Sequence, residues 1–341
     1  MGKINILMTC ASMHSNGMIR CLTENGFGTD IQVFATNSSI VDLPPNDVCE
    51  KTFVAPTIKS HNYISFLLDI CKKYKIHIII PCVTLELEFM AKNRGIFENN
   101  GIKVSVSSIE SLEITNNKIR LYDVFGKLMP DQCLPHNDDE ASIFLDLHYG
   151  KACVKVANQC GGKGFAIVDD NKALDVMMFH RFGKKHYITK DMLYKIVNSH
   201  NYNVILQEYV EGKDYTVSIL ADKGNIVNMV GYVGHIMEFG SIMYGEIKPN
   251  EMAYSIAEKI VKKTGLDGNV GIDFILKEDG NVVLLEVNPR INASLPFVKA
   301  AGINLLYKRC EMLLGLDEHP CNEHLNVGLK MKKYFETEYF I

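Results

Sequence analysis

The chain has 341 residues, of which 47% are hydrophobic and 22% charged, and its formal net charge is -4. This length exceeds the size at which one hydrophobic core keeps growing, so two or three domains are expected. The small negative charge gives no electrostatic case for binding nucleic acid or an anionic membrane, and no apolar run is long enough to cross a bilayer. The first residues run straight into a strand without a cleavable small-residue site, so we expect a cytoplasmic protein.

Ten cysteines are scattered along the chain, with no Cys-x-x-Cys pair and no Cys/His cluster. This spacing argues against both a disulfide framework and a zinc site. Cys10, Cys82 and Cys153 lie in apolar, strand-like runs, where cysteine acts as a small hydrophobe. We therefore expect reduced, buried thiols, with Cys160 as the one that could be exposed, because it lies in a glycine-rich loop.

The first hundred residues alternate short apolar runs with amphipathic ones. Strands are expected at residues 4–8, 30–35, 76–81 and 103–106, and helices at 16–25, 64–74 and 85–93. This alternation predicts a parallel sheet with helices on both faces, and ligands of such sheets bind at the carboxyl ends of the strands. Ser12 lies at such an end. The segment around it lacks the glycine pattern of dinucleotide-binding proteins, which disfavours a nicotinamide cofactor.

The character of the sequence changes after about residue 110. A polar helical stretch at 111–125 is followed by two prolines that mark a break. We predict three parts, at residues 1–112, 113–206 and 207–341. Residues 173–199 are expected to be helical, with a basic interruption at 179–186 that is either a solvated loop or a mobile cover over phosphates.

A glycine-rich loop joins two strand-like runs at 152–157 and 165–169. Its glycines leave backbone N–H groups unobstructed and its lysine adds a positive charge, so the loop could fold over phosphates, although a plain hairpin turn fits equally well. Lys155, on the strand before the loop, has apolar neighbours. It needs an anionic partner there, because an unpaired buried charge is costly.

Two further strand-like runs lie between residues 204 and 220 and are joined by a polar turn. An adenine ring needs an acceptor for its N6 amine together with a backbone donor and acceptor. Glu208, Tyr209 and Val210 supply these groups where the first run ends. Asp214 is placed to accept hydrogen bonds from ribose hydroxyls.

Residues 271–276 and 282–290 are expected to form an antiparallel hairpin around an Asp-Gly turn. Side chains on a strand alternate in direction, so Glu286, Asn288 and Arg290 project to one face. Oxygen ligands from Asp273, Glu286 and Asn288 suit Mg²⁺, and Arg290 could hold a phosphate oxygen. A solvated hairpin is the alternative, but the apolar residues that flank Glu286 favour a buried strand.

These motifs, in this order, resemble the ATP-grasp superfamily, most closely the branch of the carbamoyl phosphate synthase large subunit and biotin carboxylase. The resemblance covers nearly the whole chain. It implies an α/β fold in which an N-terminal parallel α/β domain (pre-ATP-grasp) is followed by a two-lobed α+β ATP-grasp domain. Residues 113–206 would form a linker helix and the small lobe with the glycine-rich loop, and residues 207–341 the large lobe with the metal site.

The resemblance also implies roles for individual residues. ATP would be bound by Lys118, Lys155, Gly161, Gly162, Lys163, Gly164, Gln207, Glu208, Tyr209, Val210 and Asp214. Mg²⁺, with Mn²⁺ as an alternative, would be bound by Asp273, Glu286 and Asn288, and the catalytic residues would be Lys155 and Arg290. Arg120 could take the place of Lys118.

The implied activity is that of an ATP-dependent carboxylate-amine ligase, which forms an amide or peptide bond through an acyl phosphate and releases ADP and phosphate. Its partners would be a small-molecule carboxylate and an amine. Two alternatives remain: a carbamoyl phosphate synthase-like or carboxylase-like enzyme that phosphorylates a carboxylate or bicarbonate, and a non-catalytic ATP-binding protein. Substrate contacts are expected from Ser12, His235, Glu238, Asn292 and Ser294.

Two of these expectations leave alternatives open. His235 could position a carboxylate or accept a proton from the amine, or it could be a structural histidine. A basic alternating run at 327–335 is expected to form a final edge strand. This strand or the N-terminal domain could mediate a homodimer.

Overall fold

The computed structural model describes residues 2–45, 47–157, 164–174, 187–201, 203–238, 241–316 and 324–334. They form two compact units. The first is built from described residues of the segments 1–116, 214–274 and 286–341, and the second from those of 117–213 and 275–285. These units are defined by contacts within the fold, so the three domain boundaries expected from the sequence stay predictions.

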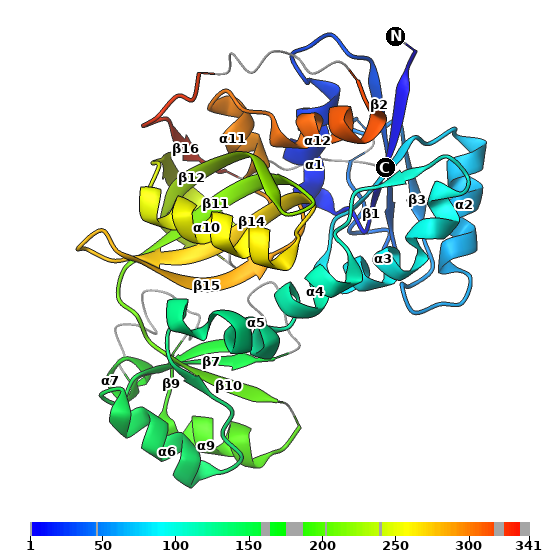
Figure 1. Ribbon diagram of the computed structural model, residues 1–341. Helices are drawn as coiled ribbons and strands as arrows, with labels where there is room; N and C mark the ends of the chain where they lie inside the picture. Colours follow the sequence, from blue (N-terminus) through cyan, green and yellow to red (C-terminus); the bar gives the residue numbers. More distant parts are fainter. Residues whose placement is uncertain are drawn as a thin grey trace. The chain divides into compact units, whose positions relative to one another are not determined.

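A five-stranded parallel sheet forms the first part of unit 1 (Figure 1). Its strand order is β3 (Lys51–Val54), β2 (Ile31–Asn37), β1 (Ile4–Thr9), β4 (Ile78–Pro81), β5 (Lys103–Val104). Its helices are α1 (Asn16–Thr23), α2 (Tyr63–Lys73), α3 (Thr84–Glu98) and α4 (Ile109–Thr115). Ile6 and Met8 share a core with α1, whereas Leu7 packs with α2 and α3, so helices cover both faces. The predicted parallel α/β fold is confirmed, with β3 as a strand that the sequence did not indicate.

Most of a six-stranded sheet forms the second part of unit 1, and the rest of this sheet belongs to unit 2. Its strand order is β15 (Val282–Asn288), β14 (Gly268–Leu276), β11 (Lys213–Asp222), β12 (Asn225–Glu238), β13 (Ser241–Ile247), β16 (Lys330–Lys332). The helices that accompany it are α10 (Glu251–Thr264), α11 (Leu295–Ala300) and α12 (Leu305–Leu314). Strand β16 confirms the predicted final strand, which pairs antiparallel with β13 at the sheet edge.

One hydrophobic core continues through unit 1. Tyr232 and Ile247 of the six-stranded sheet belong to the same buried cluster as Ile6 and Met8 of the parallel sheet, with α1, α11 and α12 between them in that cluster. Helix α1 contacts both α11 and α12. The two sheets of this unit are therefore joined by continuous apolar packing.

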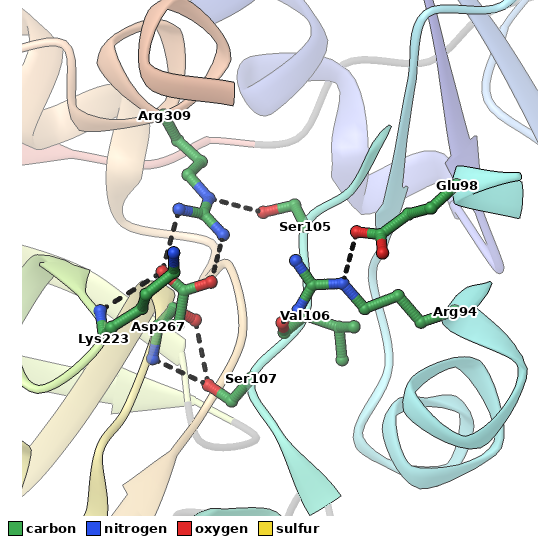
Figure 2. A network of polar contacts seen from close by, with 8 residues as sticks. All are labelled: Arg94, Glu98, Ser105, Val106, Ser107, Lys223, Asp267 and Arg309. Carbon is green, nitrogen blue, oxygen red and sulfur yellow. Dashed lines mark hydrogen bonds and ion pairs between the residues drawn. The ribbon is translucent and has the colours of Figure 1, made fainter. Parts of the chain in front are cut away.

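A buried ion pair adds a polar junction to unit 1 (Figure 2). Arg309 of α12 binds Asp267 through both terminal nitrogens, at 3.0 and 2.7 Å, and the two side chains are only 3% and 8% exposed. Arg309 Nε also donates to Ser105 Oγ at 3.2 Å, and Ser107 Oγ donates to the carbonyl of Asp267 at 2.9 Å. The pair thus joins α12, the segment before β14 and the segment after β5.

Unit 2 contains a five-stranded mixed sheet. Its strand order is β6 (Gln132–Cys133), β10 (Val204–Glu208), β7 (Ala152–Val156), β8 (Phe165–Val168), β9 (Tyr187–Ile188). Its helices are α5 (Lys118–Phe125), α6 (Asp138–Leu147), α7 (Asp170–Ala173) and α9 (Lys190–Asn198). Side chains of α6 and α9 share one core with β7 and β10. The predicted fold class, a parallel α/β domain followed by α+β lobes, is confirmed.

The helix predicted over residues 173–199 is wrong in part. Residues 187 and 188 form β9, which pairs parallel with β8, and α9 begins only after Thr189, whose hydroxyl caps it by accepting from the N–H of Met192 at 3.2 Å. The β-forming pair Tyr187-Ile188 and this cap override the helical pattern. The basic run at 179–186 lies outside the described residues.

The helical stretch predicted over residues 111–125 is two helices. Helix α4 ends at Thr115, and α5 starts afresh because Asn117 accepts hydrogen bonds from the N–H groups of Ile119 and Arg120 at 3.0 and 3.1 Å. Asparagine favours a helix start over a helix interior for this reason.

Eight cysteines lie in the described part of the chain, and each is a free thiol that is buried or half-buried. Burial raises the pKa of Cys21, Cys49, Cys71 and Cys310 to about 12, so these thiols stay protonated. Cys160 lies outside the described residues. Within the described ranges, no helix has the length and apolar character that a bilayer crossing needs.

Candidate nucleotide and metal site

The predicted hairpin near the C-terminus is formed by β14 and β15. Its turn closes through the N–H of Lys277, which donates to the carbonyl of Asn281 at 2.8 Å, and Asp279 accepts from the N–H of Asn281 at 2.9 Å. Gly280 has a φ of 86°, a conformation that favours glycine. The Asp-Gly signal in the sequence therefore identified the turn correctly.

Two carboxylates converge on one amide at this hairpin. The Nδ2 of Asn288 donates to Asp273 Oδ2 at 2.9 Å and to Glu286 Oε1 at 3.1 Å. Thr216, on the neighbouring strand β11, donates to the other oxygen of Asp273 at 2.6 Å. The structure thus brings together the three residues expected to bind Mg²⁺ and adds Thr216, which the sequence did not indicate.

The electrostatics of this cluster favour a cation. Burial, followed by the negative charge of Glu286, raises the pKa of Asp273 to about 7, and the hydrogen bond from Thr216 opposes this shift. Asp214, on the same strand as Thr216, adds a further repulsion. A divalent cation at this cluster would relieve the repulsion between the carboxylates, and a set of carboxylate and amide oxygens is the kind that Mg²⁺ and Mn²⁺ accept.

Arg290 is held by three hydrogen bonds. Its Nη2 donates to Asn288 Oδ1 at 3.3 Å, its Nη1 to the carbonyl of Ile291 at 2.9 Å, and its Nε to Thr84 Oγ1 at 3.0 Å. A guanidinium has five N–H groups. One N–H on each terminal nitrogen is not used by these three bonds, and both are suited to an anionic oxygen.

The segment after Arg290 is anchored by a polar chain. Asn292 Nδ2 donates to Ser218 Oγ at 2.9 Å, and Asn292 Oδ1 accepts from the N–H of Ser294 at 3.0 Å. Ser218 in turn is bonded to the hydroxyl of Tyr232 at 2.8 Å. A Cβ at Gly271 would lie 2.9 Å from Asn292 Nδ2, so glycine leaves room for the anchor. In this structure Asn292 fixes its own loop, and its substrate contact stays a prediction together with that of the buried Ser294.

His235 lies apart from this cluster. Its Nε2 is 3.7 Å from Glu246 Oε2, which is also 3.8 Å from Lys330 Nζ. The strand register places Glu246 on the sheet face opposite to Thr216 and Asp273. These contacts agree with the structural alternative for His235, and its role in substrate binding stays a prediction.

The two other candidate substrate residues are Ser12 and Glu238. Ser12 caps a short turn before α1, because its hydroxyl accepts from the N–H of His14 at 3.3 Å and its own N–H donates to Ser15 Oγ at 3.0 Å. Glu238 ends β12, and its side chain lies outside the described residues.

The candidate adenine segment belongs to unit 2. Lys155 Nζ donates to Oε1 of the buried Gln207 at 2.7 Å across β7 and β10, so this amide is one partner of the strand lysine. Glu208 Oε2 accepts from the N–H of Asp131 at 3.4 Å, while Tyr209 and Val210 are half-buried just past β10. Lys155 and Gln207 therefore lie on neighbouring strands of one sheet, and the nucleotide-binding role of this segment stays a prediction.

Two other candidates for phosphate binding also belong to unit 2. Gly164 directly precedes the return strand β8 and has a φ of 68°, and its carbonyl accepts from the N–H of Val156 at 3.0 Å. The loop residues Gly161, Gly162 and Lys163 lie outside the described residues. Lys118 is the half-buried first residue of α5, whereas Arg120 is exposed and 3.9 Å from Asp123.

A parallel α/β part, two antiparallel or mixed sheets, and a hairpin with paired carboxylates and an arginine define the class of ATP-grasp proteins. Comparison with known families supports this class directly. The family described as "ATP-grasp domain" matches residues 115–294, more than half of the chain, and the family described as "PylC-like, N-terminal domain" matches residues 6–105. The chain belongs to the ATP-grasp family, and the resemblance inferred from the sequence is confirmed.

Individual proteins are similar over different lengths. The carbamoyl phosphate synthase arginine-specific large chain of Bacillus subtilis (strain 168) is 24% identical over 236 residues, which are 64% of this chain and 21% of that protein. The chain thus spans about a fifth of the length of this relative.

Two solved structures are similar in fold. The biotin carboxylase domain dimer of Hydrogenobacter thermophilus 2-oxoglutarate carboxylase, in complex with MgADP, ADP and bicarbonate, has a TM-score of 0.66 and 16% identity, over 95% of this chain and 72% of that one. The L-amino acid ligase from Bacillus licheniformis has a TM-score of 0.64 and 15% identity, over 91% and 74% of the two chains.

Proposed function

We propose that the protein is an ATP- and Mg²⁺-dependent ligase that activates a small-molecule carboxylate as an acyl phosphate and joins it to an amine, with release of ADP and phosphate. The observation that carries this proposal is the cluster of Asp273, Glu286 and Asn288 with Arg290 beside it. Membership of the ATP-grasp family, and the similarity in fold to an L-amino acid ligase, support it.

We assign a separate role in the reaction to each group of residues. Asp273, Glu286 and Asn288 would hold Mg²⁺, which when bound neutralises charge on the phosphates of ATP. The two N–H groups of Arg290 that are not used by its three bonds would stabilise the oxygens of the phosphoryl group during transfer. Lys118, Lys155 and the loop residues 161–164 would contact the phosphates, while Gln207, Glu208, Tyr209, Val210 and Asp214 would hold the nucleoside.

The reaction then needs no protein nucleophile. A carboxylate oxygen of the substrate attacks the γ-phosphorus and ADP leaves. The amine nitrogen attacks the carbonyl carbon of the acyl phosphate, phosphate leaves, and the amine loses a proton. A site from which water is excluded protects the acyl phosphate from hydrolysis. Contacts to these two substrates are proposed for Ser12, His235, Glu238, Asn292 and Ser294.

The test measures the release of ADP and phosphate from ATP in the presence of Mg²⁺, with different pairs of a carboxylic acid and an amine. The condensed product is detected by mass spectrometry. We expect ADP release to require both a carboxylate and an amine. Condensed product without ADP would refute the mechanism.

A second candidate function is the phosphorylation of bicarbonate. The similarity to a carbamoyl phosphate synthase large chain and to a biotin carboxylase domain suggests bicarbonate as the phosphorylated group. This candidate predicts ADP release that depends on bicarbonate and needs no organic carboxylate, so the same assay separates it from the ligase.

A matched pair of variants tests the metal cluster. Glu286→Gln should lower turnover by roughly 100-fold or more, because it removes a charge from the site where phosphate charge is neutralised. Glu278→Gln changes an exposed glutamate in the turn of the same hairpin and should leave turnover unchanged. Equal activity of the two variants would contradict the assigned role of Glu286.

The remaining expectations about the whole protein stay predictions. A homodimer is proposed by analogy with the dimer of the biotin carboxylase domain, and light scattering during gel filtration tests it. We also propose a cytoplasmic location and three domains, at residues 1–112, 113–206 and 207–341.

A further inference from the structure

The guanidinium of Arg290 is contacted by a residue of the parallel sheet domain. Its Nε donates to Thr84 Oγ1 at 3.0 Å, and Thr84 lies 206 positions earlier in the chain. The other two bonds of the guanidinium go to Asn288 and to the backbone of Ile291, both within two residues of Arg290. Thr84 is therefore its one partner among these three that comes from a distant segment.

Thr84 stands at the start of a helix but does not cap it. Threonine is among the residues preferred at the N-cap, where its hydroxyl accepts from the backbone of the first turn. Here Val83 is the N-cap of α3, without a side-chain cap, and Thr84 is the first helical residue. Its hydroxyl oxygen instead faces Arg290 Nε, so this threonine is placed for a long-range contact.

The start of α3 is a firm support for this contact. Glu86, two residues after Thr84, is fully buried. One of its carboxylate oxygens accepts from Thr9 Oγ1 at 2.9 Å, and the other from the hydroxyl of Tyr63 at 2.6 Å. These bonds tie the first turn of α3 to the carboxyl end of β1 and to α2.

We propose that Thr84 is a positioning residue for Arg290, which fixes the guanidinium so that its unused N–H groups face the transferring phosphoryl group. This inference rests on the proposed phosphoryl transfer at the same hairpin. A fixed Nε leaves the guanidinium plane with one orientation, and catalysis by preorganised donors depends on such orientation. Thr84 itself touches neither phosphate nor substrate in this proposal.

The activity test compares Thr84→Val, which keeps the shape and removes the acceptor, with Thr84→Ser, which keeps the acceptor. Loss of a hydrogen bond to a charged group should lower kcat by roughly 10- to 100-fold in Thr84→Val. The KM for ATP should change little, because the bond orients a group that acts in the transition state. Thr84→Ser should restore kcat to within about threefold, and Thr57→Val, at an exposed loop position, should match the wild type.

A spectroscopic test does not depend on turnover. The ¹⁵N–¹H signal of Arg290 Nε in arginine-labelled protein, assigned by its loss in Arg290→Lys, should shift in Thr84→Val and return in Thr84→Ser. An unmoved signal in Thr84→Val would overturn the proposal, and so would a shifted signal with unchanged kcat. If the wild type releases no ADP with any acid or amine, the proposed function fails, and the Arg290 signal alone then decides whether Thr84 holds the guanidinium.

Discussion

Removing one partner of the pair formed by Arg309 and Asp267 should destabilise unit 1 strongly (Figure 2). The perturbation is Asp267→Asn, which keeps the shape, removes the negative charge and turns one acceptor oxygen into an N–H donor that faces the guanidinium. With both side chains less than a tenth exposed, solvent cannot take over the role of the lost carboxylate oxygen.

The magnitude follows from this burial. Breaking a buried pair by removing one partner costs about 3–5 kcal/mol, because a charge is left uncompensated. That is a large fraction of the roughly 5–15 kcal/mol that separates folded from unfolded states of typical domains. In urea, with a slope of about 3 kcal/mol per molar, the unfolding midpoint should fall by about 1–1.7 M.

The assay is urea unfolding followed by circular dichroism, since the chain has no tryptophan to report by fluorescence. The matched control is Glu24→Gln, which breaks the pair of Arg20 and Glu24, whose side chains are 56% and 61% exposed. Exposed pairs contribute about 0–1 kcal/mol, so this midpoint should hardly move. An equal shift of the midpoint in Asp267→Asn and Glu24→Gln would refute the reasoning.

A double variant tests the cause of the loss. Arg309→Met combined with Asp267→Asn removes both charges, so no buried charge is left without its partner. The combined loss should then be smaller than the sum of the two single losses by roughly 1–3 kcal/mol, which is the range found for residues in contact. Additive losses would show that the charge pairing does not explain the effect.

Two other predictions concern pH and glycines. The pKa of Asp273 is raised to about 7, above its usual value near 4, so the stability that its protonated form contributes should fall as pH rises from about 4 to 7. The free energy of unfolding, measured in urea at pH 5 and pH 8, should differ less between the two pH values in Asp273→Asn than in the wild type. An equal difference in both proteins would contradict this cause. Gly95 is an exposed residue in the last turn of α3, and an added Cβ would meet no atom within 4 Å, so Gly95→Ala should stabilise the protein by about 0.5–1 kcal/mol. Gly212→Ala should destabilise it by about 1–3 kcal/mol, because its Cβ would meet Ile275 Cγ2 and lie 2.6 Å from the carbonyl oxygen of Leu276. A thermal unfolding midpoint that shifts in the same direction for both variants would be inconsistent with this account.

The hairpin at the metal cluster could be predicted because its signals are local. The Asp-Gly turn at 279–280 set the register, and the alternation of strand side chains placed Glu286, Asn288 and Arg290 on one face. The parallel sheet was predicted for the same reason, since each strand and helix carries its own apolar pattern.

The partners of this cluster could not be predicted in the same way. Thr216 and Thr84 reach Asp273 and Arg290 from 57 and 206 positions away, and nothing in their own neighbourhoods signals these contacts. The strand β9 was missed because two residues carry too little pattern to compete with the helical periodicity around them. Tertiary pairing with β8 decides its structure.

The contact of α1 with α12 has a consequence for synthesis of the chain. Asn304 Nδ2 donates to the carbonyl of Cys21 at 2.7 Å, across 283 positions. At roughly 5–20 residues per second, the ribosome adds the second partner about 15–60 s after the first. During that interval α1 packs on the parallel sheet alone, and the side that contacts α11 and α12 stays uncovered until those helices emerge.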